Sequence, residues 1–336
     1  MTQLYTTSMN KNTRFFWLDW MKAITMLFII WGHFLSSGNE YIYVFNVPVF
    51  CLISGFLYKK EKFQTFVKKA FFNLFIPMLI MSLLMYSYKL LRLWSTGNNI
   101  DLQPLTFAKH FLMGNYWTLG PCWYIYTLII MKLILQLFPS KKWVYAVLFL
   151  LSSLSAIAIH YYGLKTGNAF CNTTVALPFF IIGFLLKQFR QGLNALHIIY
   201  AEIALLVLAV FVVYLCGQYN GEVWMFMAGY GNNFALFILG GIAGTTMVFI
   251  ISKWAERLSR NNMAMLISKG SIVILGLHIA IVQRLCELPY RSSIEDFAFS
   301  VLILLLFVPL IRIVEIYFPF LLGKYRIGSR IMPEKK

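Results

Sequence analysis

The sequence predicts an all-α polytopic membrane protein with about ten transmembrane helices and both termini in the cytoplasm. The chain has 336 residues, of which 60% are hydrophobic and only 12% are charged. A soluble domain would carry about 25% charged residues. The apolar residues gather in segments long enough to cross a bilayer, which requires about 20 residues in a helix. Lys and Arg residues concentrate in every second connection between these segments.

The expected spans are separated by gaps rich in charge or in Gly, Asn and Pro. They lie near residues 16–35, 42–58, 71–91, 120–138, 143–160, 171–187, 197–216, 233–252, 271–288 and 297–318. We expect a single transmembrane domain over residues 1–336, with a helical core of about 14–323 and short cytoplasmic tails. In the one long outer connection, the amphipathic run PLTFAKHFLMGNYW predicts a helix that lies in the membrane interface.

The charge distribution predicts the orientation. Of the 29 Lys and Arg residues, 20 lie in the connections on one side, 5 on the other and 4 within spans. The positive-inside rule places the richer side in the cytoplasm. A net charge of +17 could also suggest nucleic acid, but topology explains these positions, so we expect membrane lipids and no nucleic acid as partners. The five cysteines are widely spaced without a CxxC pair, which favours a packing role.

The first span carries three ionisable residues, Asp19, Lys22 and His33. Charge inside a membrane is costly and usually marks function. At about 100° per residue, the eleven-residue step from Lys22 to His33 leaves both side chains within about 20° of one helix face. Their axial separation is roughly 16 Å at about 1.5 Å per residue. Asp19 shares this stripe, which must face protein or water rather than lipid.

Each of these residues allows two interpretations. A neutral imidazole at His33 can take a proton from a hydroxyl near pH 7, or His33 can simply end a helix at the outer interface. Lys22 can bind an anion such as a phosphate, or it can pair with Asp19 or snorkel to the interface. The five lysines from Lys59 to Lys69 suit topology or anionic lipid, with a nucleotide phosphate as the alternative.

Other polar residues lie within the later spans. Ser54 and Gly55 in the second span indicate a close approach between helices. Trp123, in LGPCWYIY, is a candidate substrate contact or a residue of the interfacial aromatic belt. His278 lies seven residues after Ser271, and a hydrogen bond to a neighbouring helix would also explain it.

Several common catalytic motifs do not occur. The chain has no Walker A sequence, no GxGxxG opening a helix, no HExxH and no GxSxG. ATP-driven transport, metalloprotease and serine-hydrolase chemistry therefore lack support, and no metal is expected.

The order of WLDWMKAITMLFIIWGHF, FNVPVFCLISGF, a basic loop before NLFIP, PCWYIYTLI and GSIVILGLH resembles acyltransferase family three. The likeness extends from Arg14 to about Gly323, where FPFLLGK is similar to a common ending. These proteins are bacterial integral membrane O-acyltransferases, similar to acetylases of surface polysaccharides. The resemblance implies a multi-pass protein of the bacterial plasma (inner) membrane. It also implies acetyl-CoA as acyl donor, a surface glycan or lipid-linked sugar as acceptor, and glycan biosynthesis proteins as partners.

The resemblance also implies roles for individual residues. Lys22 and His33 match the family pattern of Arg or Lys, ten residues, then His, which implies that His33 is the catalytic base. The further catalytic candidates are Asp19 and His278. The donor-binding candidates are Lys22, Lys59, Lys68 and Lys69, and the substrate-binding candidates are Ser54 and Trp123. Two positions depart from the pattern: Asn73 follows the lysines where relatives have an Arg-x-x-Arg pair, and Asn46 replaces a common histidine.

The expected reaction is acetyl transfer from cytoplasmic acetyl-CoA to a sugar hydroxyl. The donor would enter from inside and the acceptor from outside, through a cavity that joins both faces around the first helix. Ser54, Trp123 and His278 are candidates for stabilising the oxyanion, and a direct transfer or an acetyl-enzyme relay through His33 are both open. The alternatives are a transporter or exporter of a glycan or small molecule without such chemistry, and a structural partner of a glycan synthase.

Overall fold

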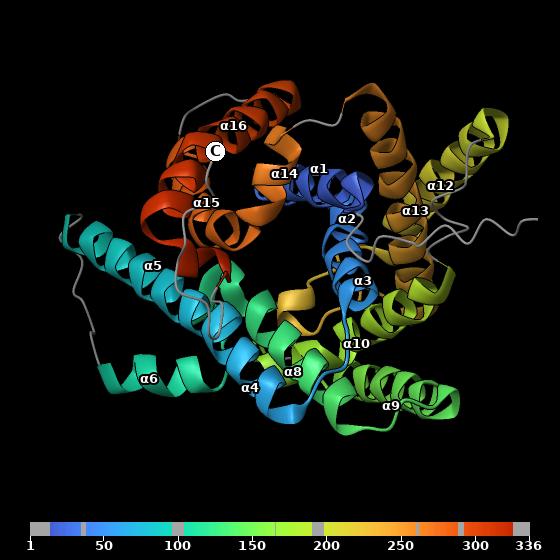
Figure 1. Cartoon of the computed structure of the whole chain (residues 1–336), viewed down its shortest axis with the longest axis horizontal. Helices are drawn as coiled ribbons and strands as arrows, with labels where there is room; N and C mark the ends of the chain where they lie inside the picture. The colour runs from blue at the N-terminus through green and yellow to red at the C-terminus, as the bar shows by residue number, and fades with distance from the viewer. Residues whose placement is uncertain are drawn as a thin grey trace, which may run out of the picture.

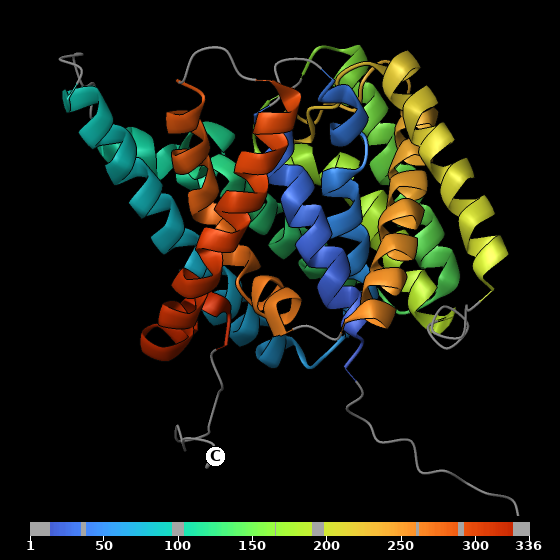
Figure 2. The same ribbon diagram turned by 90° about the horizontal axis from the view of Figure 1, so that it is seen from above.

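The computed structural model describes residues 14–34, 38–95, 104–164, 166–189, 198–259, 262–287 and 292–324. Within these ranges the chain is helical and contains no strand. Figure 1 shows the helices packed side by side, and Figure 2 shows most of them running between the same two faces of the bundle. The predicted all-α class is confirmed.

The helices follow one another along the chain with short connections. Their bounds are α1 Phe16–Gly32, α2 Glu40–Tyr43, α3 Asn46–Leu57, α4 Phe63–Ala70, α5 Ile76–Ser95, α6 Pro104–Leu112, α7 Tyr116–Leu119, α8 Trp123–Leu137, α9 Lys142–Tyr161, α10 Ala169–Leu186, α12 Ile199–Asn220, α13 Phe234–Leu258, α14 Asn262–Lys269, α15 Ser271–Leu285 and α16 Ser293–Tyr317. A π-helical turn, η1, joins α4 to α5 over Phe71–Phe75, and 3₁₀ turns lie at Gly120–Cys122 (η2), Lys187–Phe189 (η3), Met225–Met227 (η4) and Pro319–Leu322 (η5).

Long apolar helices correspond to the expected spans. In the described part of the chain, eight helical stretches are long and apolar enough to cross a membrane, and α14 with α15 form a ninth that is bent by 81°. The helix α1, with 17 residues, covers the first expected span. Arg14 and Lys324, at the two ends of the described chain, line one cavity, so both ends lie on one side of the bundle. We call this the inner side; its cytoplasmic location stays a prediction.

The helix α1 lies among α3, α13, α14, α15 and α16. Because it is surrounded by protein, α1 must be apolar on most of its circumference. Trp17, Met21, Met26 and Ile30 are buried side chains of this helix. Packing alone therefore does not explain the polar residues of α1.

Two glycines allow α3 and α10 to cross closely, as the sequence predicted for Gly55. A Cβ atom on Gly55 would collide with the carbonyl oxygen of Phe180, and one on Gly183 would collide with the carbonyl oxygen of Leu52. Small residues at such crossings let helix backbones approach in a membrane. The crossing fixes the position of α3, which carries Asn46 and Ser54.

Irregular turns shape the inner side of the bundle. The chain bends at Gly270 between α14 and α15, where a Cβ would collide with Ile311. The π-helical turn η1 contains Asn73 and Leu74. Such turns are frequent at functional sites. Both irregularities border the inner cavity described below.

The connection between α12 and α13 is buried, which the sequence did not predict. Residues Val223 and Met225 are each only 3% exposed. The Asn172 side-chain oxygen accepts a hydrogen bond of 2.9 Å from the Ala228 N–H. The Asn220 side chain donates to the Tyr230 carbonyl at 2.7 Å. Asparagines of α10 and α12 thus hold this connection inside the outer half of the bundle.

Two local expectations on the outer side have different outcomes. The amphipathic run forms the helix α6, as predicted. Trp123 is only 6% exposed and belongs to the core, as does the adjacent Tyr124, so the interfacial belt interpretation of Trp123 is wrong. Tyr124 contacts Ser54 and Phe50, so the start of α8 lies next to α3 rather than against lipid.

Candidate active site

An open cavity occupies the inner side of the bundle. Its two adjoining parts have volumes of about 430 Å³ and about 360 Å³, and both are lined by Lys22 and Ser54. Seven cationic side chains and two carboxylates line the two parts together. The cations are Arg14, Lys22, Lys59, Lys69, Lys132, Lys269 and Lys324, and the carboxylates are Asp19 and Glu61. This excess of positive charge suits an anionic ligand.

The predicted donor contacts divide into two groups. Lys22, Lys59 and Lys69 line the cavity. Lys68 is exposed on α4 and does not line it. The Lys69 ammonium donates to Glu61 at 2.6 Å, which holds one rim lysine in place.

Asp19 binds Arg14, not Lys22. The Arg14 guanidinium donates to both Asp19 carboxylate oxygens, at 2.7 Å and 2.9 Å. A bidentate pair of this kind fixes the guanidinium in orientation as well as in position. Asp19 also lies fourteen residues before His33, about 21 Å along the helix at 1.5 Å per residue. The structure therefore does not bring Asp19 to His33, and its expected catalytic role has no geometric support.

Lys132 was not singled out from the sequence. It lies in α8 and lines the inner cavity together with Lys22. Among the residues that the structure describes, neither lysine has a hydrogen bond or an ion pair. In the sequence, Lys132 is a lone lysine within the apolar run WYIYTLIIMKLILQL. A lysine at such a position can equally extend to the membrane interface, so the sequence did not mark it as a ligand-binding residue.

A smaller pocket of about 70 Å³ surrounds His33 on the outer side. Four neighbours that carry a hydrogen-bonding group line it with His33, namely Tyr43, Asn46, Tyr116 and Trp123. Its apolar lining includes Ile29, Leu275, Val223, Met225 and Phe226. Burial raises the pKa of the Tyr116 phenol, so this side chain stays protonated near neutral pH. The buried α12–α13 connection thus forms one wall of the pocket.

His278 adjoins this pocket from α15. Its ring centroid lies 5.2 Å from that of His33. The Nδ1 atom lies 2.8 Å from the Ile274 carbonyl oxygen, which can only accept, so Nδ1 carries the proton. The buried Nε2 atom has no hydrogen-bond partner among the described residues. The bond is therefore within α15 rather than to another helix, and it leaves Nε2 with a lone pair.

Asn46 contributes an amide group to the same pocket. Its side-chain oxygen accepts from the Val47 N–H at 2.7 Å. The amide NH₂ makes no hydrogen bond with another described residue, although the side chain is only 3% exposed. This donor is well placed for a ligand oxygen, and the sequence had marked Asn46 only as a departure from a common histidine.

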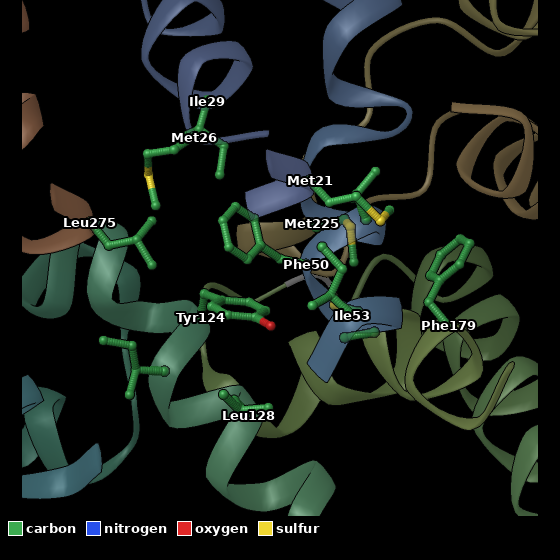
Figure 3. Close-up of a cluster of buried hydrophobic side chains, with 14 of the residues drawn as sticks. Met21, Met26, Ile29, Phe50, Ile53, Tyr124, Leu128, Phe179, Met225 and Leu275 are labelled. Atoms are coloured by element: carbon green, nitrogen blue, oxygen red, sulfur yellow. The ribbon is translucent and has the colours of Figure 1, made fainter. Parts of the chain in front are cut away.

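Leu275 separates the two spaces. It lines both the inner cavity and the His33 pocket. Figure 3 shows Leu275 in one buried cluster with Phe50, Tyr124 and Ile29. Phe50 and Tyr124 line the inner cavity, and Ile29 lines the outer pocket. The expected cavity joining both faces is thus two spaces divided by a septum of four side chains, those of Ile29, Phe50, Tyr124 and Leu275.

The geometry can be compared with known proteins. The family model described as an acyltransferase domain, that of acyltransferase family 3, matches residues 15–315, nearly the whole chain. The chain belongs to acyltransferase family 3. This acyltransferase is therefore a multi-pass membrane enzyme. Comparison with curated proteins and with solved structures gives no match.

In this acyltransferase, the single helix α1 contributes side chains to both spaces. Lys22 lies in the cationic cavity and His33 in the outer pocket, both on α1. An acyl transfer needs a site for an activated donor and a group that takes the proton of the nucleophile. This acyltransferase has a cationic cavity on its inner side and the His33 imidazole on its outer side. In its described ranges no group of three or more His, Cys, Asp or Glu side chains could hold a metal ion.

The two substrate candidates lie in different spaces of the acyltransferase. Trp123 lines the His33 pocket. Ser54 lines the inner cavity and lies 2.9 Å from the Tyr124 hydroxyl. Because Ser54 follows Asn46 by eight residues in α3, the two lie about 12 Å apart along the helix. Ser54 therefore belongs to the inner cavity, and it is not placed to stabilise an oxyanion at His33.

Proposed function

We propose that this acyltransferase transfers an acetyl group from cytoplasmic acetyl-CoA to a sugar hydroxyl of a cell-surface polysaccharide or glycolipid, in the plasma membrane of a bacterium. The observation that carries the proposal is the placement of Lys22 and His33 on α1. One lies in a cationic cavity on the inner side, and the other lies beyond the septum in an outer pocket. This arrangement suits an anionic donor and an acceptor that arrive from opposite sides.

The length of CoA supports this placement. Lys22 and His33 are separated by roughly 16 Å along α1 at 1.5 Å per residue. The pantetheine arm has a backbone about as long as four extended residues, roughly 13–14 Å at 3.3–3.6 Å each. With its phosphates at the lysines, the donor would therefore present its thioester near the septum. The methylene and dimethyl groups of the arm match the apolar lining of Leu128 and Leu275.

His33 acts as the general base in the proposed reaction. Its imidazole removes the acceptor hydroxyl proton while the hydroxyl oxygen attacks the thioester carbon. The new C–O bond forms, the C–S bond breaks, and the departing CoA thiolate recovers the proton from His33. The amide NH₂ of Asn46 would donate to the oxyanion that develops on the carbonyl oxygen.

The size of the outer pocket favours an acetyl group. Its volume is about 70 Å³, much smaller than the volumes of about 430 Å³ and about 360 Å³ of the two parts of the inner cavity. A two-carbon acyl group fits such a space, whereas a long acyl chain needs far more room.

Labelled acetyl-CoA tests the proposed function. Wild-type protein and His33→Ala in nanodiscs are incubated with donor labelled in the acetyl group and with crude surface glycan. We expect free CoA and label in carbohydrate for the wild type, and a loss of about 10² to 10⁴ in rate for the variant. A folded wild-type protein that neither binds nor cleaves acetyl-CoA would contradict the proposal and favour glycan export.

A further inference from the structure

Two lysines at membrane depth share the inner cavity. Lys22 follows the start of α1 by six residues and Lys132 precedes the end of α8 by five. At 1.5 Å per residue these positions lie about 9 Å and about 8 Å inside their helices. Both side chains line the same part of the cavity, and each is partly buried. The charge of Lys22 lies within electrostatic range of Lys132.

The carboxylates of this cavity are bound elsewhere. Asp19 forms the bidentate pair with Arg14. Glu61 accepts from Lys69 at 2.6 Å, which leaves it only a more distant neighbour of Lys132. Within the described chain, Lys22 and Lys132 thus lack a direct counter-ion.

This arrangement is unfavourable without a ligand. Each ammonium loses part of its hydration inside the bundle, and the two like charges repel each other. A bound anion would relieve both costs, because it pairs with the two lysines at once. Lysines whose only role was to set the orientation of the protein in the membrane would extend to the interface and would not both point into one cavity.

We propose that Lys22 and Lys132 together bind the phosphate that joins the pantetheine arm of the acyl-CoA donor. This inference rests on the proposed function, which supplies the donor, and it adds Lys132 as a binding residue. The assignment follows from depth: Lys59 and Lys69 are exposed on the rim, whereas Lys22 and Lys132 lie within the helices. Lys59 and Lys69 on the rim would then bind the phosphate on the ribose, at the far end of the donor.

Three thioester donors test the assignment. They are acetyl-CoA, acetyl-dephospho-CoA, which lacks the ribose phosphate, and S-acetylpantetheine, which lacks every phosphate. Thioester cleavage is measured in nanodiscs for wild type, Lys132→Gln, Lys132→Arg and the control Lys62→Gln. Lys62 is exposed at the start of α4 and does not line the cavity.

The expected pattern depends on the donor. Lys132→Gln raises KM about ten- to hundredfold for both phosphate-bearing CoA donors, which is the loss of one charge-assisted bond, and changes kcat little. Lys132→Arg recovers most of this loss. S-acetylpantetheine turnover is the same in Lys132→Gln as in wild type, and Lys62→Gln behaves as wild type. An equal loss with all three donors, or wild-type KM values in Lys132→Gln, would overturn the proposal.

Calorimetry with CoA separates this inference from the proposed function. If no donor is cleaved but Lys132→Gln weakens CoA binding, the two-lysine site stands and the acetyltransferase function fails. If acetyl-CoA is cleaved and Lys132→Gln binds CoA as the wild type does, the function stands and the two-lysine site fails. Equal thermal unfolding of the variants excludes a general effect on folding.

Discussion

The imidazole rings of His33 and His278 lie 5.2 Å apart between centroids, although 245 positions separate them in the chain. The Nδ1 proton of His278 is bound by the Ile274 carbonyl oxygen at 2.8 Å. Of the two rings, only that of His33 lines the outer pocket. In the proposed reaction His33 is therefore the base, and His278 is a neighbouring ring that does not line the pocket.

Replacing His278 should therefore cost less than replacing His33. We expect His278→Asn to lower kcat about tenfold with an unchanged KM for acetyl-CoA, and His33→Ala to lower it by about 10² to 10⁴. Steady-state kinetics of the two variants in nanodiscs checks this order. The reverse order, with His278→Asn the more damaging, would make His278 the base.

Asn46 should contribute to the transition state. Removal of one oxyanion donor typically costs about 10² to 10³ in kcat, and we expect a loss of this size for Asn46→Ala. Asn46→Ser keeps a donor at this position and should recover part of the rate. If Asn46→Ala changes only KM, the side chain binds a substrate and does not stabilise the oxyanion.

Leu275 should limit the length of the acyl chain. Leu275→Ala opens the septum, and we expect the preference for acetyl-CoA over butyryl-CoA to fall by about tenfold or more, since one methylene is worth about 10- to 200-fold. Competition between the two donors measures the ratio. Leu277→Ala is the matched control, because Leu277 lies on α15 but lines neither space. An unchanged ratio in Leu275→Ala would show that another residue sets the length.

The α3–α10 crossing should tolerate no side chain at Gly55. A Cβ there would collide with backbone, which cannot rotate away, and overpacking of this kind costs about 1–3 kcal/mol. Thermal unfolding in detergent should show a lower Tm for Gly55→Ala. At the control position Gly167 the nearest atom to an added Cβ is 3.5 Å away, so Gly167→Ala should unfold with the wild type. Equal Tm values for both variants would mean that the helices are not in such close contact.

The spans could be predicted because each is long and apolar and the lipid leaves the backbone few choices. The common face of Lys22 and His33 followed from helix geometry alone. In the structure Lys22 lines the inner cavity and His33 lines the outer pocket, which agrees with a shared helix face that looks at protein rather than lipid.

Contacts between distant segments could not be predicted in this way. Asp19 lies one turn from Lys22, yet its carboxylate binds Arg14. The guanidinium of Arg14 donates two hydrogen bonds to this carboxylate, which a lysine ammonium does not match in geometry. Lys132 meets Lys22 only through the packing of α8 near α1. The connection carrying Val223 and Met225 is held inside the bundle by Asn172 and Asn220, which come from two different helices.

Vesicles of known orientation test the central claim most directly, because acetyl-CoA does not cross membranes. Labelled acetyl-CoA is added outside everted vesicles, which expose the cytoplasmic face, and outside right-side-out vesicles that hold the same protein and glycan. We predict cleavage and labelled carbohydrate only with the everted vesicles, with losses in both Lys22→Gln and His33→Ala. Equal labelling in the two kinds of vesicle, or full activity of either variant, would contradict a donor at Lys22 that reacts at His33.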